Sequence, residues 1–216
     1  AMKKMLLMAI AATAAIWIYA IPQPGLVQGK LANMSDTTTP FASWTSTSVV
    51  PGVMFATCAG TYTYGGITYS FGLNAGNPTC TYTYGGTTYS MGANAGWGYH
   101  GYMRMVGGIT YHFAKYFDDA AYIKVDGVSV LANTIWNEYP VRSYTPSATG
   151  WHEVDIRLGN GTGGVGGGAS WISAVGSGII WNTNGISTAA STLANPSLWH
   201  PLHNVGSDVY LYSEIP

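Results

Sequence analysis

Residues 108–131 read GITYHFAKYFDDAAYIKVDGVSVL, and this stretch decides the fold. Within it, residues 121–125 alternate apolar and polar side chains with the two-residue period of a β-strand. Asp126-Gly127 is a typical two-residue hairpin turn, and residues 128–131 resume the alternation. The stretch therefore predicts an antiparallel hairpin with one buried face.

A second strand is expected in residues 150–166, which read GWHEVDIRLGNGTGGVG. The expected core positions are Trp151, Val154, Ile156 and Leu158. The expected solvent-facing positions are His152, Glu153, Asp155 and Arg157. Asn160 begins a glycine-rich loop, where the strand should end.

From residue 23 to residue 216 no segment keeps a helical 3.6-residue period, and Thr, Tyr, Val, Ile and Gly dominate. Such a composition favours strands and turns, so we expect a mainly β protein. The hydroxyl-rich residues 35–50 are expected to form a surface arm or an edge strand.

Charge is scarce. Charged residues make up 8% of the 216 residues and the net charge is −1, whereas an ordinary soluble domain has about 25% charged residues. No basic patch is present to neutralise phosphates, so no nucleic-acid partner is expected. Few charges also mean weak repulsion between copies, which suits a surface protein that packs against itself.

The N-terminus reads AMKKMLLMAIAATAAIWIYA over residues 1–20, with two lysines ahead of an apolar run from residue 5 to residue 20. This pattern is typical of a secretory signal peptide. As a helix ended by Pro22 and Pro24, the run would span about 24 Å, which is short for a bilayer of about 30 Å. A helix that is apolar all round must be buried, in a membrane, in the protein's own core or among neighbouring subunits.

An apolar N-terminal helix followed by a β-rich head resembles pilin-type subunits. The resemblance covers about 20 residues, and Met5 stands where pilins generally carry a glutamate. It implies polymerisation through the helix. The expected assembly residues are Leu6, Leu7, Ile10, Ala14 and Trp17.

An internal repeat precedes the hairpin, because residues 61–76 and 81–96 match at 13 of 16 positions. Each copy reads as a hairpin with a Gly-Gly turn, inserted at residues 58–97. Four tyrosines should share one face of their strands: Tyr62, Tyr64, Tyr82 and Tyr84. Such a stripe is a packing surface between subunits or a platform for sugar stacking, and we expect the packing surface.

Cys58 and Cys80 stand just ahead of the two copies. Two cysteines in a chain with a secretory pattern favour one disulfide, and two buried free thiols are the alternative. A bridge would close a loop around the first copy and stabilise the fold by about 3 kcal/mol.

Three features together resemble the protective-antigen-type β-sandwich domain. They are a strand that ends in two adjacent aspartates, a strand that runs into Asp-Gly and a strand that begins with Gly-Trp-His. The closest likeness is to its surface-protein and flocculin-like adhesin branch. Two phrases carry it, VDGVSVL at 125–131 and GWHEVDIRLGNGTGGVG at 150–166, and it covers residues 25–215. The resemblance implies an antiparallel, jelly-roll-like β-sandwich over residues 23–216, following the apolar helix of residues 1–22.

The resemblance also implies a metal site. In sugar-binding members of this family, two adjacent aspartates joined by a cis peptide hold a calcium ion that contacts sugar hydroxyls. The corresponding residues are Asp118 and Asp119, with Asn160 as a further oxygen donor. The alternative is that the pair only shapes a turn and caps backbone amides.

No catalytic residues are expected. Asp118 and Asp119 are sequence neighbours, whereas glycosidases place two carboxyl groups about 5 to 9 Å apart across a bond. The sequence has no GxSxG motif and no HExxH motif, and its glycine-rich loop is not followed by the GK[ST] of a P-loop.

Two functions fit these features. The first is a structural subunit of an extracellular filament or surface layer, whose partners are copies of itself and which meets a membrane only before assembly. The alternative is a secreted, calcium-dependent adhesin whose partner is carbohydrate. Both place the protein outside the cell or on its surface, and the surroundings of residues 5–19 discriminate between them.

Overall fold

The structure is a computed structural model that describes residues 22–54, 60–64, 67–71, 80–115, 117–163, 179–187, 198–202, 204 and 209–216. Of residues 60–80 it describes only the backbone of the strands. Residues 1–21, with the five expected assembly residues, lie outside the described part, and the filament hypothesis built on them stays a prediction. The Cys58–Cys80 bridge and the packing of Tyr62 and Tyr64 also fall outside it.

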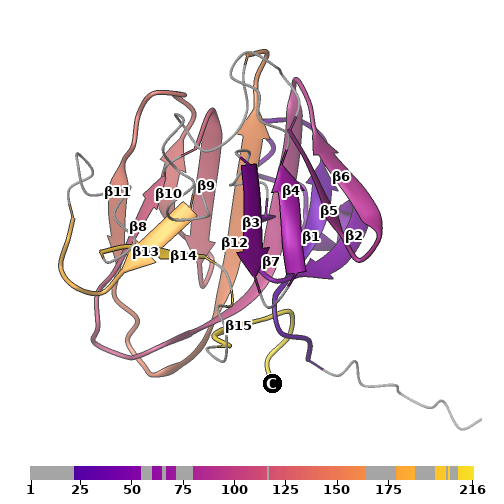
Figure 1. Ribbon diagram of the computed structural model, residues 1–216. Coiled ribbons are helices and arrows are strands. Elements are labelled where there is room, and N and C mark those ends of the chain that lie inside the picture. The colour runs from indigo at the N-terminus through magenta and orange to yellow at the C-terminus, as the bar shows by residue number, and fades with distance from the viewer. Residues whose placement is uncertain are drawn as a thin grey trace, which may run out of the picture.

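The larger of two main sheets has seven antiparallel strands (Figure 1). Its order is β10 (Val128–Asn133), β9 (Ala120–Val125), β12 (Gly150–Asn160), β7 (Ala95–Met105), β1 (Leu26–Leu31) and β2 (Thr45–Val50), with β15 (Leu211–Tyr212) also paired to β7. The predicted hairpin is β9–β10. Its turn residues Asp126 and Gly127 have φ values of 50° and 75°, as a tight hairpin turn requires. The predicted edge strand is β2.

The smaller sheet and two hairpins complete the fold. The sheet order is β11 (Val141–Tyr144), β8 (Tyr111–Lys115), β13 (Ile179–Asn182) and β14 (His200–Pro201). The hairpins are β3 (Gly60–Tyr64) with β4 (Ile67–Phe71), and β5 (Cys80–Tyr84) with β6 (Thr87–Met91). One core cluster joins Ile156 of the large sheet, Phe113 of the small sheet and Tyr82 of the second hairpin. The chain is therefore mainly antiparallel β, with two layers around a shared core.

No described helix is long and apolar enough to cross a membrane. Between β1 and β2 the structure describes a short 3-10 turn, η1 (Phe41–Ser43).

Strand β12 corrects one sequence expectation. Val154, Ile156 and Leu158 are buried as predicted, but Trp151 and His152 exchange sides. The register pairs His152 with the buried Met103 and Trp151 with the exposed Arg104. Strict alternation along the strand dictates this, because Trp151 is an odd number of residues from Val154.

The second tyrosine hairpin is part of the core. Tyr82 is 1% exposed and stacks on Tyr89 with 5.0 Å between ring centroids. The expectation that Tyr82 packs against another subunit is therefore wrong, because the domain's own core encloses the side chain. Tyr84 is half-buried against the same core, and its packing against a neighbour stays a prediction.

Residues 36–44 cover the outer face of the large sheet. Trp44 packs where Gly98 has no side chain, since a Cβ atom at Gly98 would lie 2.3 Å from the Trp44 ring. Arg157, expected to face solvent, is only 5% exposed beneath this segment. Its Nη1 and Nη2 atoms donate to the carbonyl oxygens of Asp36 and Thr39 at 3.2 and 3.0 Å. Where residues 37 and 38 of this segment meet the sheet, a pocket remains on the outer face.

Candidate functional site

The predicted calcium ligands lie at one end of the large sheet. There β12 ends beside the starts of β9 and β7, because Gly159 pairs with Ala120 and Asn160 pairs with Ala95. The loops that follow β12 and precede these two strands therefore meet at the same place. Antiparallel pairing is what brings residues about 40 positions apart together here.

Asp118 and Asp119 immediately precede β9 and are joined by a cis peptide bond, as the family resemblance implies. The Asp119 carboxylate accepts a hydrogen bond from the Gly161 N–H at 2.6 Å. The Asp119 N–H in turn donates to the Gly159 carbonyl at 3.3 Å. These two bonds attach the aspartates to the segment that contains Asn160.

Asn160 is fully buried at the end of β12. Its Nδ2 atom donates to the Gly92 carbonyl at 3.0 Å, which fixes the plane of the carboxamide. The Asn94 N–H donates to the Gly161 carbonyl at 2.7 Å, so the loop before β7 also holds this segment. The structure thus places Asp118, Asp119 and Asn160 in one loop cluster.

The neighbouring Asp119 disfavours the charged form of Asp118. Burial, a hydrogen bond to the Asp119 side chain and the Asp119 charge together raise the pKa of Asp118 to about 7, although Lys115 acts in the opposite direction. Two adjacent, partly buried carboxylates favour a shared proton or a bound cation.

Lys115 offsets this charge only from a distance. It is fully buried, and its Nζ atom donates to Asn133 Oδ1 and to the Ile135 carbonyl, both at 2.6 Å. Burial lowers the pKa of Lys115 to about 8, against the opposing influence of Asp119, Asp118 and Glu138. The ammonium group thus binds the end of β10 and the loop that follows it.

The donor set suits a hard cation. Two carboxylates and a carboxamide are oxygen ligands of the kind that calcium prefers. Among the described residues, no three His, Cys, Asp or Glu side chains are grouped so that they could hold a metal ion. A calcium ion here would therefore need the Asn160 amide, backbone carbonyl groups or water to complete its shell.

The described histidines make local contacts. His100 pairs with Glu153 at 2.8 Å, and His112 pairs with the Ser143 hydroxyl at 2.8 Å. His152 contacts Asp126 at 2.6 Å and the Ala148 carbonyl at 3.0 Å, so both ring nitrogens face acceptors. These contacts join strands and turns of the fold. The expectation that the chain is not an enzyme stays a prediction.

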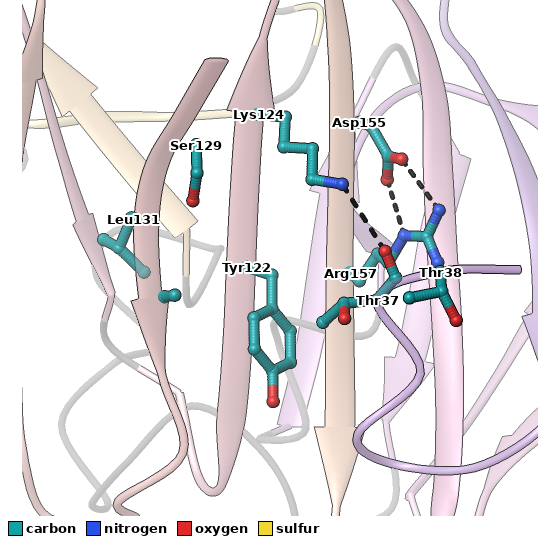
Figure 2. Close-up of a pocket in the computed structure, with 9 residues that line it drawn as sticks. Thr37, Thr38, Tyr122, Lys124, Ser129, Leu131, Asp155 and Arg157 are labelled. Carbon is teal, nitrogen blue, oxygen red and sulfur yellow. Dashed lines mark hydrogen bonds and ion pairs between the residues drawn. The ribbon is translucent and has the colours of Figure 1, made fainter. Parts of the chain in front are cut away.

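Sequence reasoning missed a pocket of ≈ 330 Å³ on the outer face of the large sheet (Figure 2). It is lined by residues of the neighbouring strands β10, β9 and β12 and by Thr37 and Thr38 of the covering segment. The threonines lie more than 80 residues from the strands in sequence, so no local motif could have indicated the pocket.

Comparison with known proteins reaches the level of fold. No protein-family model matches the chain, and no curated protein matches it either. A solved structure of an anti-sigma factor domain-containing protein is similar, with a TM-score of 0.50 and 13% identity. That match covers 88% of this chain and 49% of the other, so the chain spans about half the length of the protein it resembles.

Two further structures are less similar. The PA14 domain of the antifreeze protein MpAFP has a TM-score of 0.47 and 16% identity, covering 91% of this chain and 94% of that domain. The A domain of epithelial adhesin 6 from Candida glabrata, solved with Galb1-3GlcNAc, has a TM-score of 0.49 and 12% identity, covering 90% and 88%. The likeness to the anti-sigma factor protein concerns the fold alone. The two proteins share a β-rich architecture although their sequences differ widely.

Proposed function

We propose that this chain is an extracellular, calcium-dependent carbohydrate-binding module of the adhesin type. The observation that carries the proposal is the loop cluster in which Gly161 donates to Asp119 at 2.6 Å, directly beside Asn160. The sequence resemblance to protective-antigen-type adhesins supports it, because Asp118 and Asp119 correspond to the calcium-binding aspartate pair of that family and Asn160 offers a further oxygen donor.

Asp118, Asp119 and Asn160 would hold the ion, which would supply a hard-cation contact for the hydroxyl groups of a sugar. The chain's own bonds prepare these residues. The Gly161 N–H orients the Asp119 carboxylate, and the Gly92 carbonyl orients the Asn160 amide. Side chains that are already held in place lose less conformational entropy when the ion binds, so the entropic cost of binding is smaller.

Isothermal titration of chelator-treated protein with calcium, followed by a glycan panel with and without chelator, tests the proposal. We expect heat with calcium, a lower melting temperature after chelation because the ion stabilises only the folded state, and glycan binding that chelator abolishes. Asp119→Asn should remove all three responses. Glu214→Gln, which removes one charge from an exposed residue near the C-terminus, should leave them unchanged.

Two other outcomes would overturn the proposal in different ways. Calcium binding without any glycan response would identify a structural ion. No heat with calcium would leave Asp118-Asp119 as a device that shapes the turn.

A further inference from the structure

We propose that the pocket on the outer face of the large sheet is a second ligand site, which binds a carboxylated sugar such as a uronic acid. It is lined by side chains of β9, β10 and β12 and shares no residue with the Asp118, Asp119 and Asn160 cluster. The inference does not depend on calcium, so it is independent of the function proposed above.

Lys124 is the cation that this pocket offers to a ligand. Figure 2 shows it reaching from β9 toward Thr37, where its Nζ atom donates to the Thr37 carbonyl over a long 3.4 Å. Although Asp155 lies directly opposite Lys124 in the β12–β9 register, the structure records no ion pair between these two described residues. The ammonium group therefore keeps donors for a ligand.

Arg157 explains why Asp155 does not pair with Lys124. The Nε and Nη2 atoms of Arg157 donate to the two carboxylate oxygens of Asp155 at 2.9 and 2.8 Å. Its remaining donors bind the Asp36 and Thr39 carbonyls, which attaches the covering segment. The Nη1 atom of Arg157 also lies 3.5 Å from the Asp36 carboxylate, so the guanidinium serves two acidic groups. Asp155 is thus engaged by Arg157 rather than by Lys124, and such two-bond pairs are strong and geometrically specific.

The groups around Lys124 suit the rest of a sugar acid. Ser129 lies opposite Lys124 in the β10–β9 register and lines the same pocket, so it offers the ligand a hydroxyl group. The Tyr122 ring also lines the pocket, and the neighbour opposite it is the small Ala132, which leaves the ring uncovered on that side. An aromatic ring contacts the apolar face of a sugar, while hydroxyl groups bond its edge.

The size of the pocket limits the ligand. A volume of ≈ 330 Å³ is at the lower end of the range of about 300–1,000 Å³ that is usual for small-molecule sites. One sugar unit, free or at the end of a chain, is therefore the expected occupant. The charge on Lys124 favours an acidic unit over a neutral one.

The test is a titration of the full chain, in chelator, with glucuronic acid and separately with glucose, monitored by heat and by NMR shifts. We expect glucuronic acid to bind and glucose to bind at least about tenfold more weakly. Added salt should lower the affinity for glucuronic acid, as a charge-assisted contact requires. Because chelator is present throughout, the result does not depend on the calcium site.

Variants locate the binding. Lys124→Met should lower the affinity for glucuronic acid by about tenfold or more, and Tyr122→Ala should lower it as well. Lys30→Met removes an exposed lysine of β1 outside the pocket and should change nothing. Equal affinity for glucose, unchanged affinity in Lys124→Met, or no response to glucuronic acid at millimolar concentration would each overturn the proposal.

Discussion

The hydroxyl group of Tyr82 donates a hydrogen bond of 2.5 Å to the Oε1 atom of Gln28. The bond joins the second tyrosine hairpin to strand β1, and the two side chains are 1% and 0% exposed. A repeat unit that looks like a surface insertion in the sequence is therefore attached to the core of the large sheet by a buried polar contact.

Removing the Tyr82–Gln28 hydrogen bond should destabilise the fold. Tyr82→Phe keeps the ring but leaves a buried Gln28 oxygen without its donor, which should lower the free energy of unfolding by about 1–3 kcal/mol. Urea denaturation measures the change. Tyr102→Phe, in a half-exposed tyrosine of β7, should be nearly neutral. A double variant, Tyr82→Phe with Gln28→Leu, should recover part of the lost stability because no buried polar atom is then left without a partner. Equal losses of stability in Tyr82→Phe and Tyr102→Phe would show that the Tyr82–Gln28 bond does not stabilise the fold.

Gly159 in β12 is expected to tolerate no side chain. A Cβ atom there would lie 2.0 Å from the Met34 carbonyl oxygen, and the backbone at Met34 cannot yield as a flexible side chain would. Gly159→Ala should therefore cost at least about 1–3 kcal/mol and weaken calcium binding, because Asn160 and Gly161 follow directly.

The matched control is Gly150→Ala in the same strand, where nothing lies within 4 Å of the added atom. It should be neutral or slightly stabilising, because alanine restricts the unfolded chain more than glycine. Thermal unfolding of the two variants gives the comparison, and similar melting temperatures would show that the segment at Met34 does not pack on Gly159.

Arg157 is expected to be irreplaceable even by lysine. Lysine keeps the charge but cannot bond both Asp155 oxygens and the Asp36 and Thr39 carbonyls at once. Arg157→Lys should cost about 3 kcal/mol, since it strands buried acceptors, and should loosen residues 36–44 in hydrogen exchange. Arg142→Lys, in an exposed arginine of β11, should leave stability and exchange unchanged. Wild-type protection of residues 36–44 in Arg157→Lys would disprove the anchoring role.

Asp36 should make the fold sensitive to acid. Burial alone would raise its pKa, but hydrogen bonds from the Thr39 hydroxyl and from the N–H groups of Thr39, Ala32 and Thr38 outweigh burial and lower the pKa from 3.8 to about 2. The ionised form therefore favours folding. This stability is fully present above about pH 4 and is lost as the pH falls through about 2, with a total of about 2 kcal/mol.

Measuring the free energy of unfolding between pH 5 and pH 2 checks this, and Asp36→Asn should flatten the profile in that window. Asp155→Asn is not a suitable control because it disturbs Arg157, whereas Glu214→Gln changes an exposed carboxylate and should keep the wild-type slope. An unaltered slope in Asp36→Asn would assign the acid sensitivity to another group.

Local pattern predicted the strands well. Alternation in residues 121–125 and the Asp126-Gly127 turn indicated β9, its turn and β10, and the hydroxyl-rich residues 35–50 indicated the edge strand β2. These features depend on neighbours along the chain, which the sequence displays directly. The same reasoning misplaced Trp151 because it ranked hydrophobicity above strict alternation, and it misplaced Arg157 because a charged residue was assumed to face water.

The sequence by itself determined that this chain forms antiparallel β-strands, that a tight turn lies at Asp126-Gly127 and that two carboxylates stand side by side at Asp118-Asp119. The tertiary structure decided the rest. It buried Tyr82, covered Arg157 with residues 36–44, joined Asp119 to Gly161 and formed a pocket where Thr37 and Thr38 meet strands β9, β10 and β12. The physical reason is that side-chain periodicity records which residues share one face of a strand, whereas the segment that covers this face is selected by packing between parts distant in sequence.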